Sequence, residues 1–174
     1  MGIAANHEKF YKGHLGSVNR ADFLDDVSGP GTFEAGGANM SLGKVFIIDD
    51  EAHVRKTVGL ALKQGGYEVL EAADGEEAIA TIQSSSTDTS FQVIICDLAM
   101  PKVNGNDLIA FIRAKLPSVP VIVLTGYPDV QGAASLFNQG VVDYLIKPPQ
   151  VQTLLDAVKR AIEEQAVFEQ DFSA

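Results

Sequence analysis

The chain has 174 residues, of which 46% are hydrophobic and 21% charged, enough apolar material for one domain with a buried core. It carries 13 Lys and Arg against 23 Asp and Glu, a net charge of -10, which argues against binding to a nucleic-acid backbone. The single cysteine, Cys96, excludes an intrachain disulfide. The start shows no signal pattern, and no apolar run approaches about 18 residues. We therefore expect a cytoplasmic protein with no membrane insertion and no nucleic-acid partner.

The first 42 residues lack the periodic apolar pattern of a packed segment, and they include a stretch rich in glycine and turn residues at 28–37. We interpret residues 1–42 as a flexible leader without a fixed fold. A short helix over residues 20–27 is consistent with three apolar residues there at helical spacing.

From Lys44 onward, short apolar runs alternate with longer amphipathic segments. The short runs predict strands at residues 45–48, 67–72, 91–96, 119–124 and 141–146. The longer segments predict helices at residues 54–62, 74–83, 105–115, 128–138 and 151–164. A polar loop is expected at 84–90 and a tail at 165–174.

Strands that alternate with helices and are apolar at nearly every position indicate a parallel sheet covered on both faces. Right-handed crossovers then give a doubly wound arrangement. The predicted fold class is therefore α/β. It is a flavodoxin-like, doubly wound sheet of five parallel strands in the order 2-1-3-4-5, with five helices and a domain over residues 43–164.

Polar side chains follow four of the five predicted strands at the point where each strand ends. They are Asp49, Asp50, Asp97, Thr125 and Lys147, with Glu51 after the first pair. Ligands of such folds bind beyond the carboxyl ends of the strands, so these side chains are expected to converge. Each alone could be a helix cap, a turn residue or a surface lysine. Their joint placement favours a site.

The chemistry of these groups suits phosphoryl transfer. Three carboxylates at one edge repel one another unless a cation offsets them, and oxygen-only ligands suit Mg²⁺. The Lys147 ammonium and the Thr125 hydroxyl could contact oxygens of a phosphoryl group. Asp97, at the end of the middle strand, is the best candidate for a carboxylate nucleophile.

Over residues 44–164 these features make the sequence resemble the receiver domain of response regulators in two-component signalling, in particular single-domain regulators of the chemotaxis type. The resemblance is carried by four stretches: Ile-Ile-Asp49-Asp50-Glu51, Cys-Asp97-Leu-Ala-Met100-Pro101-Lys-Val-Asn-Gly105, Leu-Thr125-Gly126 and Asp-Tyr144-Leu-Ile-Lys147-Pro148.

The resemblance implies a role for each residue of the site. Asp97 would be the phosphoacceptor. Mg²⁺ would be bound by Asp50, Asp97 and the backbone carbonyl of Ala99, with Asp49 acting mainly through a metal-bound water. Lys147 would contact the phosphoryl oxygens, and the peptide bond from Lys147 to the following proline is expected to be cis.

The resemblance also implies a switch. Thr125 would be drawn toward the phosphoryl group, and Tyr144 would rotate into the space behind it, which changes the surface of the fourth helix, fifth strand and fifth helix. Ala99 and Tyr127 occupy the two positions that tune the lifetime of the phosphoryl group. Ala99 has no side chain that could orient a water molecule, so we predict that intrinsic dephosphorylation is not fast.

Only 27 residues follow Lys147, so the sequence predicts a stand-alone regulator that signals by binding. It would not be an enzyme, except that it assists its own phosphorylation and dephosphorylation. The expected partners are a sensor histidine kinase or phosphotransfer protein, an unidentified output protein and, after phosphorylation, a second copy.

Two alternatives stay open. An aspartyl-nucleophile phosphatase uses similar residues, but it needs an Asp-x-Asp pattern on its first strand and a cap segment, and neither is found here. A phosphorylation-independent, receiver-like scaffold is disfavoured by the intact acceptor, acid pair, threonine and lysine. Flavin binding is also disfavoured, because the first strand is not followed by a phosphate-binding loop.

Overall fold

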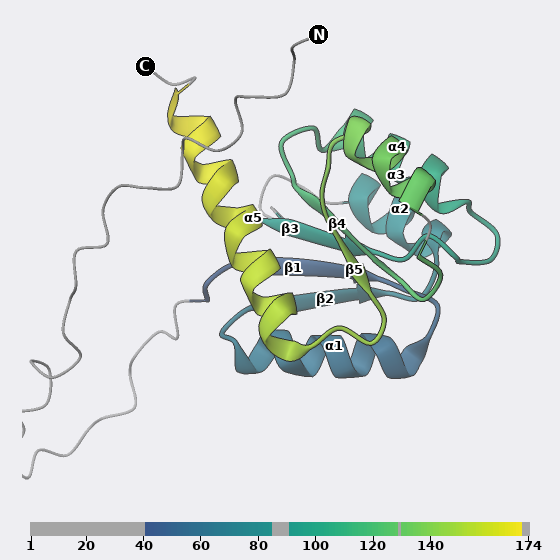
Figure 1. The fold of residues 1–174 in the computed structure, drawn as a ribbon, viewed down its shortest axis with the longest axis horizontal. Coiled ribbons are helices and arrows are strands. Elements are labelled where there is room, and N and C mark those ends of the chain that lie inside the picture. Colours follow the sequence, from purple (N-terminus) through teal and green to yellow (C-terminus); the bar gives the residue numbers. More distant parts are fainter. Residues whose placement is uncertain (1–40, 85–90, 129, 172–174) are drawn as a thin grey trace, which may run out of the picture. The chain divides into compact units, whose positions relative to one another are not determined.

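The computed structural model describes residues 41–84, 91–128 and 130–171, which form a five-stranded sheet with helices on both faces (Figure 1). The strands are β1 Lys44–Ile48, β2 Glu68–Ala72, β3 Val93–Cys96, β4 Val121–Thr125 and β5 Val141–Ile146. All pairings are parallel, in the order β2-β1-β3-β4-β5. The predicted fold class and strand order are confirmed.

Helices follow the strands in strict alternation. They are α1 Ala52–Gln64, α2 Gly75–Ser84, α3 Gly105–Lys115, α4 Val130–Asn138 and α5 Val151–Asp171. The last helix continues seven residues past its predicted end at 164, because no glycine or proline interrupts the segment. None of the described helices is long and apolar enough to cross a membrane. The leader through residue 40, with its predicted helix at 20–27, lies outside the described residues, and so does the loop at 85–90.

Apolar side chains fill both faces of the sheet, as β1 illustrates. Phe46 and Ile48 pack with α2, α3 and α4 on one face, whereas Val45 and Ile47 pack with α1 and α5 on the other. This alternation follows from the strand period of two, and it explains why the central strands are apolar at nearly every position. The edge strands β2 and β5 are partly exposed. The central strands, which are buried on both faces, are therefore held by packing from both sides.

The loop after β3 lies close against the start of α3, where Gly105 leaves the space that it needs. A Cβ at Gly105 would lie 2.5 Å from Leu98 Cα and 2.8 Å from the Leu98 carbonyl oxygen, and backbone atoms cannot rotate away. We expect Gly105→Ala to lower the free energy of unfolding by about 2 kcal/mol in urea denaturation.

A second glycine provides the control for this prediction. A Cβ at Gly126 would have Lys147 Cδ, at 4.0 Å, as its nearest neighbour, so Gly126→Ala should lose no more than about 0.5 kcal/mol. Equal stability of the two variants would contradict the close approach at Gly105.

Candidate functional site

Two buried carboxylates meet at the carboxyl edge of the sheet. Asp49 follows β1 and Asp97 follows β3, and the register of these neighbouring strands pairs Ile48 with Cys96. The Asp97 amide donates a hydrogen bond to the Ile48 carbonyl at 2.9 Å, which continues the ladder by one residue. Both aspartates are buried because they end strands that helices cover on both faces. Strand pairing itself therefore places the two acids side by side.

A third carboxylate, that of the exposed Asp50, completes an acidic cluster. One oxygen from each of Asp49, Asp50 and Asp97 lies within 4.8 Å of the others. Backbone amides orient the buried pair: Glu51 N–H donates to Asp49 Oδ1 at 2.8 Å, and Ala99 N–H donates to Asp97 Oδ1 at 3.1 Å. Each buried carboxylate thus has one oxygen held by the backbone and the other free to face a ligand or counter-ion.

Lys147 brings a positive charge into this cluster from the end of β5. Its Nζ atom lies 2.6 Å from Asp49 Oδ2, 2.6 Å from Asp97 Oδ2 and 2.9 Å from Glu51 Oε1. The contact with Asp49 Oδ2 is an ion pair without hydrogen-bond geometry, and this oxygen has no hydrogen-bond partner among the described residues. The bond from Lys147 to Pro148 is cis, so that prediction is confirmed.

Charge and burial act against each other in this cluster. Burial raises the pKa of Asp49 above its usual value, and contact with Lys147 only partly offsets this effect. Burial also lowers the pKa of Lys147, but the contacts with Asp49, Asp97 and Glu51 together outweigh it and hold that pKa above its usual range. When all are ionised, four carboxylates including Asp50 face one ammonium, an excess of three negative charges. Such an excess favours a bound cation.

The other predicted residues lie around a cavity. Thr125 is buried at the end of β4, and its Oγ1 accepts a hydrogen bond from Tyr127 N–H at 3.2 Å. Ala99, Thr125, Tyr127 and Tyr144 all line this cavity, which has a volume of about 200 Å³. Tyr144 is half-buried and packs against the core on the side of α2, α3 and α4. Space is therefore available beside both Thr125 and Tyr144.

The structure also involves two residues to which the sequence analysis assigned no role. Glu51 contacts Lys147, and the only signal for it was its position directly after the acid pair. Lys102 adopts a left-handed backbone with φ 72°, which is unusual for a residue other than glycine. Its Nζ contacts Asp74 at 2.7 Å and Glu76 at 3.3 Å, which ties the loop after β3 to the start of α2. No local pattern in the sequence indicates this link.

Comparison with known proteins identifies relatives of the chain. The sequence model of one protein family, the response regulator receiver domain, matches residues 45–159. The response regulator protein FleR of Pseudomonas aeruginosa is 32% identical over 117 residues, which cover 67% of this chain and 24% of FleR. The DNA-binding transcriptional regulator NtrC of Salmonella typhimurium is 32% identical over 123 residues, which cover 71% of this chain and 25% of NtrC. The chain therefore spans about a quarter of the length of these curated relatives.

Two solved structures share the fold over nearly their whole length. A response regulator receiver domain protein from Clostridium thermocellum has a TM-score of 0.67 and 32% identity, covering 73% of this chain and 99% of that chain. The chemotaxis response regulator CheY4 of Vibrio cholerae has a TM-score of 0.62 and 32% identity, covering 70% of this chain and 99% of that chain.

Proposed function

Because the chain belongs to the family of response regulator receiver domains, we propose that it accepts a phosphoryl group on Asp97. The observation that carries this proposal is the Lys147 ammonium, whose Nζ lies 2.6 Å from Asp97 Oδ2 at the buried end of β3. The donor is the phosphohistidine of a sensor histidine kinase or of a phosphotransfer protein. The family match over residues 45–159 supports a receiver domain over residues 43–164, with the leader and the tail outside it.

The transfer is a displacement at phosphorus. A carboxylate oxygen of Asp97 attacks, and the new O–P bond forms as the P–N bond to the donor imidazole breaks. The electron pair of that bond stays on the imidazole nitrogen, which then takes up a proton. Lys147 offsets part of the negative charge that the carboxylate and the phosphoryl group bring together, and a preorganised ammonium in a buried site does so strongly.

The acidic cluster fits Mg²⁺. Asp49, Asp50 and Asp97 offer carboxylate oxygens only. Asp49 Oδ2 is buried and, although it lies 2.6 Å from Lys147 Nζ, it has no hydrogen-bond partner among the described residues. These residues and the Ala99 carbonyl would hold the ion. Bound Mg²⁺ would supply positive charge that offsets the acids and the phosphoryl oxygens.

The cavity beside Thr125 and Tyr144 supports the proposal of a switch. A phosphoryl oxygen on Asp97 attracts the Thr125 hydroxyl, and the cavity of about 200 Å³ leaves room for the Tyr144 ring to move. Phe137 of α4 and two side chains of β5, Val142 and Ile146, are exposed. These apolar side chains support a docking surface over α4, β5 and α5 for an output protein or for a second copy.

Ala99 and Tyr127 line the same cavity and are proposed to tune the lifetime of the phosphoryl group. Ala99 lacks a polar group that could orient a hydrolytic water. We expect Ala99→Asn to change the rate of phosphate loss, accelerating it on the order of tenfold, because the amide can position that water. The time course of dephosphorylation measures this effect, and an unchanged rate would count against the role of Ala99.

The whole protein's partners are not given by its relatives. FleR and NtrC extend well beyond the matched region, so the expectation of a stand-alone receiver is not confirmed. NtrC is described as a DNA-binding transcriptional regulator, so the expected absence of a nucleic-acid partner is not confirmed either.

The phosphoacceptor role is tested directly by incubation with acetyl phosphate, with and without Mg²⁺, followed by measurement of the intact mass. We expect one phosphoryl group to be added, and we expect the addition to require Mg²⁺. A wild-type chain that stays unmodified in both conditions would contradict the proposal.

A further inference from the structure

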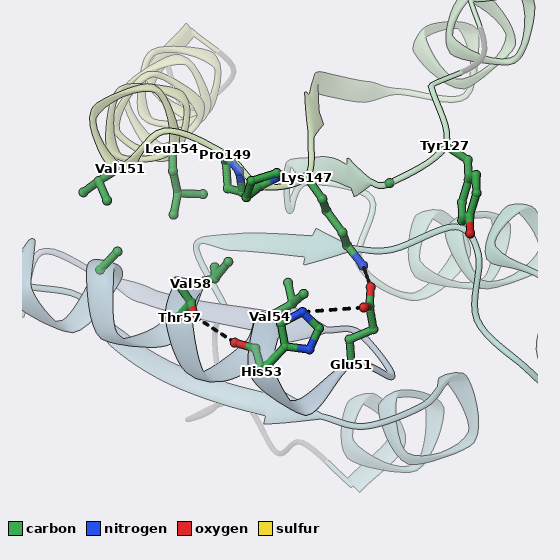
Figure 2. Close-up of a pocket in the computed structure, with 13 residues that line it drawn as sticks. Glu51, His53, Val54, Thr57, Val58, Tyr127, Lys147, Pro149, Val151 and Leu154 are labelled. Carbon is green, nitrogen blue, oxygen red and sulfur yellow. Dashed lines mark hydrogen bonds and ion pairs between the residues drawn. The ribbon is translucent and has the colours of Figure 1, made fainter.

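Lys147 has a third carboxylate partner outside the buried acid pair, and Figure 2 shows this contact together with the neighbouring His53. The Glu51 side chain is 45% exposed, whereas those of Asp49 and Asp97 are 2% and 3% exposed. The Lys147–Glu51 distance of 2.9 Å is also the longest of the three. The contact with Glu51 is therefore the easiest of the three for Lys147 to give up.

The backbone of Glu51 is fixed at the start of α1. Its N–H donates to Asp49 Oδ1, and its carbonyl oxygen accepts from the amides of Val54 and Arg55. Only the side chain can move away from Lys147. It has room to do so, because Glu51 lies on the rim of a groove of about 490 Å³ between α1 and the start of α5 (Figure 2).

An ammonium has three N–H donors, and three carboxylates surround the one on Lys147. Only the contacts with Asp97 and Glu51 are hydrogen bonds, but all three carboxylates crowd the ammonium, so an oxygen of a phosphoryl group on Asp97 competes with them for Lys147. We propose that Glu51 is a positioning residue that competes with the phosphoryl group for Lys147 and so stabilises the unphosphorylated form. This inference rests on the proposed function.

Two electrostatic effects act in the same direction. The Glu51 carboxylate lies 2.9 Å from the Lys147 ammonium and attracts it. Once a phosphoryl group is present, the carboxylate of Glu51 also lies near its negative charge and repels it. Both effects raise the energy of the phosphorylated state relative to the unphosphorylated one.

The test is the binding of beryllium fluoride, a mimic of the phosphoryl group, in the presence of Mg²⁺. We expect Glu51→Gln to bind it roughly threefold to tenfold more tightly than the wild type in titration calorimetry, with a smaller gain at high salt. Glu51→Asp keeps the charge, but its side chain is one methylene too short to reach Lys147. We expect it to bind more tightly than the wild type as well.

The matched control is Glu76→Gln, which removes one charge at the same edge of the sheet from a side chain paired with Lys102 instead of Lys147. The affinity of Glu76→Gln for beryllium fluoride should equal that of the wild type. Wild-type affinity in Glu51→Gln would overturn the inference, and so would a gain in Glu51→Gln that is absent from Glu51→Asp. If neither the wild type nor Glu51→Gln binds beryllium fluoride, the proposed function fails and the inference fails with it.

Discussion

The Asp97→Asn variant is expected to keep its unmodified mass after incubation with Mg²⁺ and acetyl phosphate, whereas the wild type gains one phosphoryl group. An amide oxygen carries no negative charge and is a poor nucleophile, although Asn has nearly the same shape as Asp. Its oxygen can still accept a hydrogen bond from Lys147, which lies 2.6 Å from Asp97 Oδ2 in the wild type. The substitution should therefore remove the chemistry and keep the fold.

Two measurements separate a chemical effect from a structural one. The melting temperature of Asp97→Asn should not fall below that of the wild type, because the variant removes one of four clustered negative charges. Asp107→Asn removes an exposed charge in the first turn of α3 and should accept phosphate like the wild type. An undiminished adduct on Asp97→Asn would show that another residue is the acceptor.

Replacing Lys147 with Met is expected to destabilise the fold by about 3 kcal/mol at neutral pH without Mg²⁺. The substitution leaves the buried carboxylates of Asp49 and Asp97 without the ammonium that lies 2.6 Å from each of them. Uncompensated buried charge is among the largest single causes of instability in proteins. Urea denaturation of the two proteins measures the difference.

The difference in the free energy of unfolding between the wild type and Lys147→Met should depend on pH. The pKa of Lys147 is raised in the folded protein, so the contribution of Lys147 to stability is complete below about pH 10 and is lost as the pH rises through the folded value. Burial raises the pKa of Asp49, so the difference should also narrow as the pH falls toward that raised pKa, where the acid becomes neutral. The largest difference is therefore expected near neutral pH.

Lys159→Met is the control for the loss of a lysine. Lys159 is exposed on α5, and its Nζ lies 3.7 Å from Glu163 Oε1, a pair worth less than about 1 kcal/mol. Similar stability of the two Met variants would contradict a stabilising role of Lys147 at the buried acids.

The fold could be predicted because its signals are local and periodic. The apolar run at 45–48 and the stripe of α1 repeat with the periods of strand and helix, and alternation of the two leaves few topologies. The predicted ends of elements were less accurate. The last helix was predicted to end at residue 164, but α5 continues to Asp171, since several good helix formers follow residue 164.

The positions of the acidic groups could also be predicted, because parallel strands carry their carboxyl ends to one edge. Asp49 and Asp97 follow neighbouring strands, and strand order alone brings them together. For Lys147, the sequence predicted the correct edge of the sheet. Its contacts, however, depend on how far its side chain reaches across the end of β4 toward the acids that follow β1 and β3. Backbone topology places a Cα atom to within a few ångströms, whereas an ion pair requires far finer placement.

The parallel sheet and the edge at which the acids, Thr125 and Lys147 gather could be derived from the sequence, because they depend on periodicity and on strand direction. The folded structure was needed to see that Glu51 shares Lys147 with the buried acids, since Glu51 and Lys147 are 96 positions apart. It also decided which residues enclose the cavity beside Thr125. Such contacts depend on the rotamers and packing of side chains from different elements, and no local pattern in the sequence records them.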